Sequence, residues 1–484
     1  MQQISFKNFR KFRDIPPINF SPITILVGEN NAGKSTVVKA ILSILDFIDT
    51  KFEFKGKDSQ KDILKQYFYF NKSYFAHIGT FKRALCNNSD DSTIEMAFMA
   101  SNIKITLRIF GDCEDEEAVR GQIVFLKIEL LEIGIVLNYH FLNDKLQVEL
   151  NSPEGKIKLE HDKEIVNYEG VPLNANFETH IIPDELVLGG SLLDVLISRY
   201  AVAIKDISNN PNFNSIHTKY NISKETRDYI VRNKKALYLD INSSFFPMYM
   251  ITSFIVNIDY IYAHAVTQTI IYSAKDTNDY FVKTIHEFAS LRVDDNSKAK
   301  RFIHKWMQEF KIGENYKIES VGGEAHVVKI NAMDGSSVNL ADKGMGSIRL
   351  MILLFRLATK IHQSIGAFSD RNNRNVTIII EEPEQNLHPT LQSKLADLFF
   401  ELYDIYGFKF LIETHSEYLI RKTQLIVKEK YNTDEKLKKC PFKVYYFPSD
   451  GNPYSMVYKK SGIFENSFGT GFFDEASNLA FELF

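Results

Sequence analysis

The chain has 484 residues, of which 44% are hydrophobic and 25% charged, so it is globular and long enough for about two or three domains. Its 58 basic and 61 acidic side chains give a formal charge of −3, which provides no global attraction to nucleic acid but allows a local basic face. The three cysteines, Cys86, Cys113 and Cys440, lie far apart and match neither a disulfide framework nor a metal-spaced pair, which fits a reducing cytoplasm.

The N-terminal segment lacks the basic and apolar regions of a leader peptide, and no stretch reaches the roughly 18 apolar residues of a membrane span. We therefore expect a cytoplasmic protein with no membrane partner. Short strands are expected over residues 4–9 and 17–27. The aromatic residues around them are interpreted as core, with stacking of one ring on adenine as the alternative; they are Phe6, Phe9, Phe12 and Phe20.

The most specific motif is a complete phosphate-binding loop that follows an apolar strand and opens a helix. The loop consists of Gly28, Glu29, Asn30, Asn31, Ala32, Gly33, Lys34, Ser35 and Thr36. Its glycines allow the backbone amides and the helix N-terminus to point at phosphate oxygens. Lys34 is expected to reach the β- and γ-phosphates, and the Ser35 hydroxyl is expected to bind Mg²⁺. The loop therefore predicts nucleotide binding.

The middle of the chain changes pattern twice. Segments such as 94–98, 104–109 and 122–126 alternate as strands and predict an antiparallel sheet. Residues 185–250 and 275–312 show helical spacing instead and predict a mainly helical insertion.

A second decisive strand is expected over residues 376–380, and Glu381, Glu382, Pro383 and Glu384 follow it. In open α/β sheets ligands bind outside such strand ends. Glu381 is expected to orient Mg²⁺ through its water shell, and Glu382 to polarise the attacking water. The alternative is an ordinary strand that ends in an acidic turn.

The next strand, expected over residues 408–412, ends in a segment that contains His415. An imidazole there can donate a hydrogen bond to a γ-phosphate or to the water beside it, because neighbouring strand ends share one sheet edge. A structural histidine is the alternative. Upstream, a glycine-bearing turn over residues 340–347 precedes a helix expected over 348–365. It predicts a second anion site, with a plain turn and cap as the alternative.

The order of these motifs resembles the ABC-type ATPases of the RecF, SMC and OLD kind. The segments Asn8–Phe12 and Leu387–Pro389 resemble motifs of these proteins as well. The resemblance covers residues 1–90 and 315–484 and implies an α/β fold, a P-loop NTPase head with an antiparallel β lobe and an inserted helical region. The implied domains are the N-terminal head part (1–90), a β-rich lobe (91–180), the helical insertion (181–312) and the C-terminal head part (313–484).

The resemblance also implies roles for the residues. ATP and Mg²⁺ would be the ligands, with Ser35 and Glu381 at the metal, Glu382 as the catalytic Walker B carboxylate and His415 as the switch histidine. His388 would lie in the D-loop that contacts a second subunit. The signature motif would act on ATP bound by a second subunit; it consists of Lys343, Gly344, Gly346 and Ser347.

The chain departs from the family pattern in several places. Its signature is not the Leu-Ser-Gly-Gly-Gln of transporters, and Arg349 or Lys343 is expected to supply the positive charge. The Q-loop is assigned to Val266–Gln268, after a strand at 258–265. No heptad hairpin indicates an SMC arm. After His415 no acidic cluster like that of the OLD nucleases follows, so we expect an ATPase without its own effector.

Standalone ATPases of this kind resemble the ATPase subunits of anti-phage systems such as PARIS, Septu and some retrons. This resemblance implies a homo-oligomer, at least a dimer, that controls a separately encoded effector, a nuclease, and responds to a phage-protein trigger. The alternative is a DNA-binding repair or recombination ATPase, in which nucleic acid would contact a basic stretch of the insertion: Lys300, Arg301, His304, Lys305 and Lys311. A transporter subunit and a small-molecule kinase are less well supported, since no coupling partner or acceptor site is recognisable.

Overall fold

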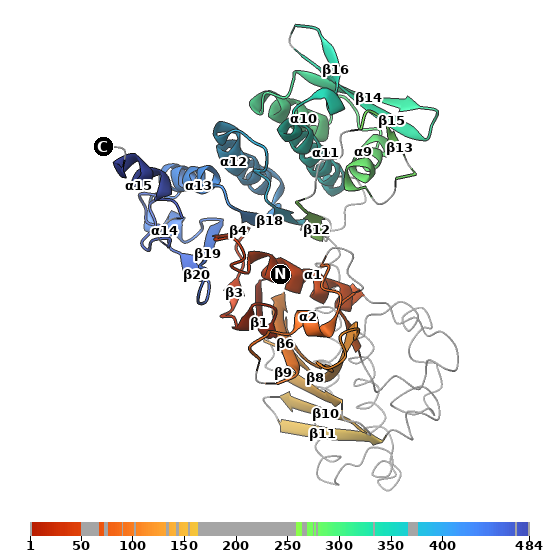
Figure 1. The fold of residues 1–484 in the computed structure, drawn as a ribbon, viewed down its shortest axis with the longest axis vertical. Coiled ribbons are helices and arrows are strands. Elements are labelled where there is room, and N and C mark those ends of the chain that lie inside the picture. Colours follow the sequence, from red (N-terminus) through yellow and green to blue (C-terminus); the bar gives the residue numbers. More distant parts are fainter. Residues whose placement is uncertain are drawn as a thin grey trace. The chain divides into compact units, whose positions relative to one another are not determined.

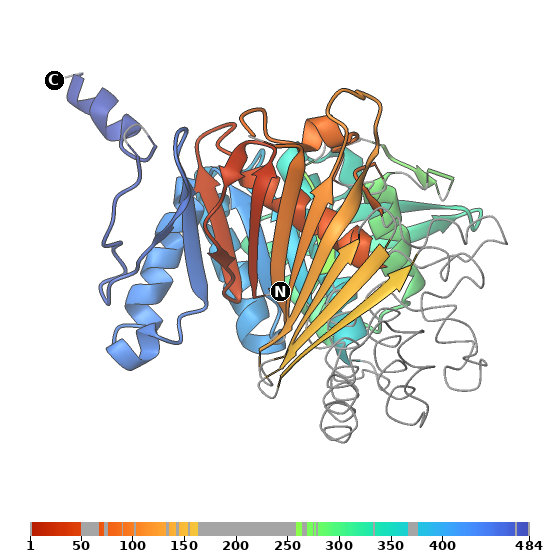
Figure 2. The same ribbon diagram turned by 90° about the horizontal axis from the view of Figure 1, so that it is seen from below.

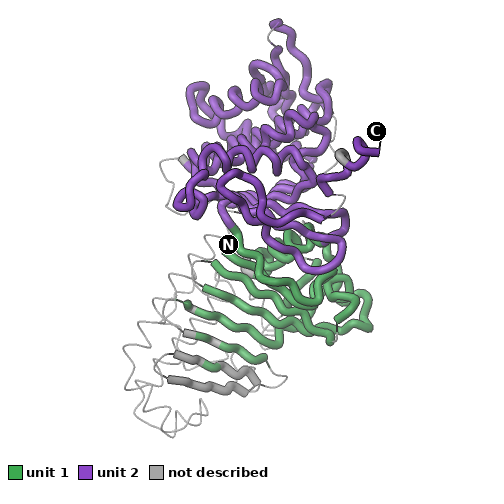
Figure 3. Tube along the Cα trace, turned by 90° about the vertical axis from the view of Figure 1, so that its left-hand side faces the viewer, with its two compact units in different colours: residues 1–20, 33–256 green, residues 21–32, 257–484 purple. Residues whose placement is uncertain are grey.

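The computed structural model describes residues 2–49, 67–71, 76–89, 91–100, 103–131, 135–141, 145–152, 155–162, 258–263, 269–273, 275–276, 279–332, 334–365, 376–469 and 472–482. The chain forms two compact units, which Figure 3 shows in different colours. Unit 1 comprises residues 1–20 and 33–256, and unit 2 comprises residues 21–32 and 257–484. The boundary at Ala32 and Gly33 falls inside the phosphate-binding loop, so both units contribute to that motif.

Unit 1 is built on an antiparallel sheet, whose long strands lie side by side in Figure 2. Their order is β11 (Gly155–Asp162), β10 (Lys145–Ser152), β9 (Ile135–Phe141), β8 (Arg120–Leu130), β7 (Ile103–Phe110), β6 (Thr93–Ala100), β1 (Gln3–Phe9) and β2 (Phe12–Asp14). Two short strands lie off this path: β3 (Ile18–Asn19) pairs with β1, and β5 (Tyr67–Tyr69) pairs with β8. The antiparallel sheet expected from the alternating pattern is thus confirmed.

The described residues of unit 1 include the helix α1 (Lys34–Asp49), which contacts β1 and β5, and the short α2 (Phe81–Ala84). The expected aromatic core is present, because Phe6, Phe9 and Phe12 are buried and their rings meet edge to face, Phe6 contacting both others. Phe20 is only half-buried.

Unit 2 contains the parallel sheet that the apolar strands predicted. Its order is β12 (Ile258–Ile261), β17 (Thr377–Glu381), β18 (Lys409–Thr414), β4 (Ile23–Gly28), β19 (Phe442–Phe447) and β20 (Tyr454–Met456). All neighbours are parallel except β20, which forms a hairpin with β19. Every residue of β4 is buried, as expected for a central parallel strand. The carboxyl ends of β17, β18 and β4 therefore lie at one edge of the sheet.

Helices complete this part of unit 2. The long α12 (Pro389–Tyr406) and α13 (Glu417–Lys430) contact each other and are followed by α14 (Asp434–Leu437) and α15 (Glu475–Glu482). The bounds of α12 follow from its sequence. Pro389 occupies the first turn, where a missing N–H costs nothing, and Gly407 ends the helix with a left-handed φ of 71°.

The remaining part of unit 2 is a lobe of three helices and a small antiparallel sheet, labelled in Figure 1. The helices are α9 (Tyr280–Ser290), α10 (Lys298–Glu309) and α11 (Met345–Ile365), and α11 contacts both others. In the sheet β15 (Ala325–Asn331) lies between β13 (Tyr272–Ser273) and β14 (Asn315–Val321), and β15 also pairs with β16 (Ser337–Asn339). The 3₁₀-helix η2 (Leu340–Asp342) connects β16 to α11.

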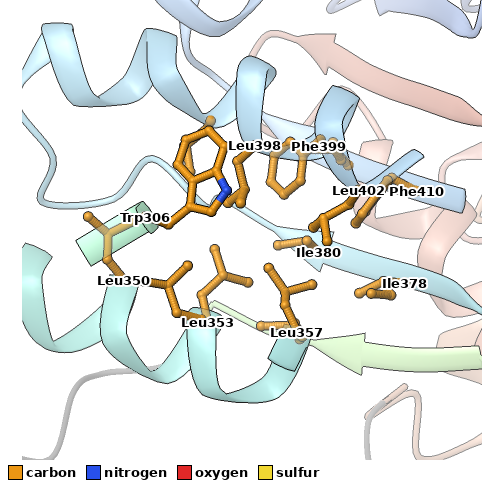
Figure 4. Packing of buried hydrophobic residues seen from close by; sticks show 14 of the residues in the cluster. Trp306, Leu350, Leu353, Leu357, Ile378, Ile380, Leu398, Phe399, Leu402 and Phe410 are labelled. Atoms are coloured by element: carbon orange, nitrogen blue, oxygen red, sulfur yellow. The ribbon is translucent and has the colours of Figure 1, made fainter. Parts of the chain in front are cut away.

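One hydrophobic core joins this lobe to the parallel sheet. Figure 4 shows Leu350, Leu353 and Leu357 of α11 on one side of β17 and Leu398 and Phe399 of α12 on the other, with Trp306 of α10 beside Leu398. Full burial of each such side chain stabilises the fold by about 1.5–3 kcal/mol. This packing holds the start of α11 against the loop that follows β17.

Two expectations need correction. The helix expected from Ile348 begins three residues earlier, at Met345, because the apparent turn at Gly346 and Ser347 is already helical. The strand expected over 258–265 ends at Ile261, and the suggested Q-loop lies outside the described residues. So does the expected helical insertion between residues 185 and 250, although α9 and α10 are helices as expected.

In the described part of the chain, no helix has the length and apolar character needed to cross a membrane.

Candidate nucleotide-binding and catalytic site

The phosphate-binding loop begins where β4 passes closest to β19. Gly28 has a φ of 151°, and an added Cβ would lie 2.1 Å from the carbonyl oxygen of Phe447. The backbone N–H of Glu29 donates to the same oxygen at 3.2 Å. Only glycine fits here, because the obstacle is backbone that cannot rotate away.

The second half of the loop leads into α1. Gly33 has a φ of 100°, and an added Cβ would lie 2.5 Å from the ring of Phe12. Lys34 and Ser35 are the first residues of α1, and the N-terminus of a helix favours anions. Lys34 is buried, whereas Asn30 and Asn31 are exposed. These are the features that a bound phosphate requires, so the loop fits a nucleotide.

The first carboxylate, Glu381, is the last residue of β17 and lies opposite Glu413 of β18. Tyr260 of β12 hydrogen-bonds to the Glu381 carboxylate. Burial, together with the negative charge of Glu381, raises the pKa of Tyr260 far above its usual value, so the phenol stays a donor. Tyr260 thereby orients Glu381. The sequence alone does not indicate Tyr260, because it lies more than a hundred positions from Glu381.

Glu382 has an unusual backbone. Its φ is 44°, a left-handed conformation that costs energy in a residue other than glycine or asparagine. The backbone N–H of Glu382 donates to the carbonyl of Glu413 at 2.7 Å, and Gln385 donates its side-chain amide to the Glu382 carboxylate. These contacts hold the carboxylate in one position beyond the strand end.

Glu384 connects the ends of β17 and β18. Its carboxylate accepts a hydrogen bond from the backbone N–H of His415 at 2.6 Å. Burial raises the pKa of Glu384, although this hydrogen bond opposes the shift. The His415 side chain is exposed, and Ser416 after it caps α13 by accepting from the N–H of Leu419. Glu384 is thus a positioning residue for the His415 backbone, a role the sequence did not indicate.

The expected signature residues lie on both sides of the start of α11. Lys343 follows η2, and Gly344 accepts the first helical hydrogen bond, from the N–H of Ser347 at 2.9 Å. Gly346 is buried against the loop after β17, where an added Cβ would lie 2.4 Å from the carbonyl oxygen of Asn386. Gly346 is therefore glycine for close packing, not for a turn.

Two further residues lie near this loop. His388 caps α12, its Nδ1 accepting from the N–H of Thr390 at 3.4 Å. Burial lowers the pKa of Arg349, while the charge of Glu382 acts in the opposite direction. Arg349 is thus electrostatically coupled to Glu382 of the same chain. Within unit 2 the structure brings together Glu381, Glu382, His415, the start of α11 and the His388 loop.

Part of the basic stretch on α10 is neutralised. Lys300 pairs with Asp295, and Lys305 pairs with Glu401 of α12. Arg301 is exposed, and His304 contacts the ring of Tyr316.

In the part of the chain that the structure describes, no group of three or more His, Cys, Asp or Glu residues could hold a metal ion. A Mg²⁺ held by Ser35, one carboxylate, nucleotide oxygens and water does not require such a group.

Comparison with known proteins finds similar solved structures. Similar solved structures include an SmcHead bound to the C-winged helix domain of ScpA (11% identity, 95% of this chain and 98% of that chain, TM-score 0.35). They also include an Smc head domain with an extended coiled coil, bound to the C-terminal domain of ScpA and derived from Pyrococcus furiosus (11% identity, 100% of this chain and 98% of that chain, TM-score 0.36). A third is the SMC head domain from Thermotoga maritima (10% identity, 95% of this chain and 98% of that chain, TM-score 0.34).

No curated protein matches the chain. A protein-family model described as an AAA ATPase domain, in contrast, matches residues 1–420. This match extends over most of the sequence and includes the phosphate-binding loop, both carboxylates and His415. The chain therefore belongs to the AAA ATPase domain family AAA_15.

Proposed function

We propose that the protein binds and hydrolyses ATP with Mg²⁺ and acts as a switch in an anti-phage defence complex. In this complex it would form a homo-oligomer and control a separately encoded effector, a nuclease, in response to a phage protein. The observation that carries the ATPase part is the strand order of unit 2. Because β17, β18 and β4 are parallel neighbours, the start of the phosphate loop, the carboxylates and His415 open at one sheet edge.

Each residue then has a defined task. Lys34 binds the β- and γ-phosphates, and Ser35 binds Mg²⁺ together with Glu381, which Tyr260 orients. Glu382 accepts a proton from the attacking water, and its fixed position favours in-line attack. His415 donates a hydrogen bond toward the γ-phosphate. Bound ATP supplies the negative charge around which these groups act.

A second subunit would complete the site. Lys343, Gly344, Gly346 and Ser347 would contact the γ-phosphate of its ATP through the amides at the start of α11. His388 and its loop, which pack against Gly346, would lie at the same contact. ATP binding would thereby join two subunits, and hydrolysis would release them, which changes whether the effector is held.

The test is the solution mass of Glu382→Gln protein with and without ATP and Mg²⁺. The amide cannot accept the proton, so turnover should fall by roughly 10²–10⁴-fold while ATP still binds. We expect the mass to rise to that of a dimer or larger assembly only with ATP. Lys34→Ala, which should lose ATP binding, is the control. A Glu382→Gln protein that stays monomeric with ATP would reject the shared site.

A DNA-binding repair or recombination ATPase is the second candidate. It is favoured by two exposed cations of α10, Lys298 and Arg301, which form no ion pair with any described residue. The charge-neutral Lys298→Gln/Arg301→Gln double variant should then weaken DNA binding and reduce its salt dependence. The absence of salt-dependent DNA binding in the wild type would dismiss this candidate.

A further inference from the structure

A cavity of about 770 Å³ lies in the lobe of unit 2, and none of its lining residues is assigned to ATP. The end of α9, the segment after it, the start of α10, and strands β14 and β15 form its walls. This volume lies within the range of small-molecule sites. Cavities of this kind have mostly apolar walls and a few convergent polar groups, so the chemistry of the lining indicates what would bind.

The charge of the lining favours an anion. Three cationic side chains, Arg292, Lys300 and Lys317, face one carboxylate, Asp295. Asp295 is already paired with Lys300, and Lys317 contacts Glu319 at 2.9 Å. The guanidinium of Arg292 forms no ion pair or hydrogen bond with any described residue, although its backbone is held in a left-handed conformation with a φ of 45°. Its fork of donors suits a phosphate.

One of two neighbouring imidazoles adds a further donor. His286 and His326 lie with ring centroids 4.4 Å apart, and His286 Nε2 is 2.9 Å from the carbonyl oxygen of Tyr272. Nδ1 of His326 is buried and has no hydrogen-bond partner among the described residues. Burial and the neighbouring His286 lower the pKa of His326. As the neutral Nδ1–H tautomer, His326 can donate to an anion in the cavity beside the two rings, which would satisfy the buried nitrogen.

An aromatic wall lies beside these groups. Phe288 stacks on Phe355 of α11 at 4.9 Å, and Tyr316 meets the same ring edge to face at 5.1 Å. The Tyr316 hydroxyl is buried and lacks a hydrogen-bond partner among the described residues. A polar ring placed against this wall would gain stacking area and satisfy the hydroxyl. Cations, orphaned donors and an aromatic wall thus converge on one cavity.

We propose that this cavity binds a small phosphorylated molecule of the nucleoside monophosphate class. Arg292 and Nδ1–H of His326 hold the phosphate, and Tyr316 contacts the base. The site is separate from the phosphate-binding loop and does not depend on the function proposed above. The lining residues Phe288 and Tyr316 contact Phe355 of α11, the helix that carries the expected signature residues. A molecule bound in the cavity would therefore lie next to side chains that pack on this helix.

The test is calorimetric titration of the full-length Lys34→Ala protein, in which the phosphate-binding loop is disabled, with AMP, adenosine and pyrophosphate. We expect saturable binding of AMP at one site per chain, and weaker binding of the two partial ligands. Arg292→Gln should weaken AMP binding at least tenfold, which corresponds to about 1.4 kcal/mol, because a charged hydrogen-bond donor is lost.

The matched control is Arg301→Gln, which removes the same charge from an exposed position of α10 outside the cavity. Glutamine and arginine have nearly the same backbone preferences. Arg292→Gln therefore adds no new strain at the left-handed φ of this position. An unchanged melting temperature of the Lys34→Ala/Arg292→Gln protein will show that it folds. The proposal is rejected if AMP gives no binding heat up to about 5 mM, a concentration at which even millimolar affinity is detectable. Equal AMP affinities of the two variants, or pyrophosphate binding as tight as AMP binding, reject it as well.

Discussion

Glu384 lies almost fully buried between two strand ends, where one carboxylate oxygen accepts the N–H of His415. Its other oxygen has no hydrogen-bond partner among the described side chains and backbone groups. Burying a carboxylate without full compensation disfavours its charged form, and this is why the pKa of Glu384 is raised. Glu384 thus positions the backbone of His415 in the proposed catalytic segment, and its buried charge lowers the stability of the fold.

This cost predicts a pH dependence. A raised folded-state pKa contributes stability that is fully present below the unfolded value and is lost as the pH rises through the folded value. Neutral glutamine keeps the acceptor for His415 and does not titrate. Glu384→Gln should therefore melt at a higher temperature than wild type at pH 8, and the difference should vanish toward pH 4. Thermal melts across this range test the prediction, with Glu314→Gln, an exposed position, as control. A melting temperature that falls further below that of wild type as the pH rises from 4 to 8 would instead show that the charged form is stabilised.

Elements are coupled in unit 2 by one buried ion-pair network. Arg356 of α11 binds both carboxylate oxygens of Asp259 in β12, with two N–O distances of 2.5 Å, and also pairs with Glu287 of α9. Burial alone would lower the pKa of Arg356, but the hydrogen bonds and charge of Asp259 outweigh it and raise the pKa. The neighbour of Asp259 in β12 is Tyr260, which touches Glu381. The ion-pair network thus connects α11 to β12, whose Tyr260 contacts Glu381 at the end of β17.

Breaking this network should be expensive. Arg356→Ala leaves Asp259 buried without its main partner, and removal of one member of a buried pair costs about 3–5 kcal/mol. Denaturant unfolding should show this loss. The matched control is Arg421→Ala, which removes an exposed pair with Glu417 on α13 and should cost no more than about 1 kcal/mol. Equal losses in the two variants would mean that the Asp259 pair contributes no more than a surface contact.

The start of α11 gives a second prediction at the scale of elements. An alanine Cβ at position 346 would collide with backbone at Asn386, whereas one at position 344 would meet nothing within 4 Å. Gly346→Ala should therefore separate α11 from the loop after β17, destabilise the protein by roughly 1–3 kcal/mol and reduce ATP turnover. Gly344→Ala should leave stability within about 1 kcal/mol of wild type. Similar melting temperatures of the two variants would contradict the tight contact.

The predictability of these elements depended on their burial. The strands around residues 23–27, 376–380 and 408–412 were recognised because central parallel strands are apolar along their whole length. The start of α11 was misjudged by three residues, because Gly346 and Ser347 read as a turn. Glycine there serves a tertiary contact with Asn386, and nothing in its sequence neighbours indicates that contact.

At the scale of the whole molecule, a shared ATP site predicts complementation between two inactive variants. Lys34→Ala disables the phosphate loop, and Ser347→Arg blocks the start of α11. In a mixed dimer one site combines an intact loop with an intact α11, and the other site carries both defects. With random pairing, half of the dimers are mixed, so turnover should recover to about one quarter of wild type. Turnover that stays at the level of the separate variants would contradict a site used in trans.

The sequence by itself predicted the chemistry that we propose for this protein. The phosphate-binding loop, the paired carboxylates and the histidine after a strand are local patterns, in which residue type and spacing carry the physical requirement. The tertiary structure alone decided how these patterns are arranged: the position of β18 between β17 and β4, the contact of Tyr260 with Glu381, the support of His415 by Glu384 and the cavity beside α9. These contacts join residues far apart in the chain, and they arise from the packing of whole elements, which no local spacing encodes.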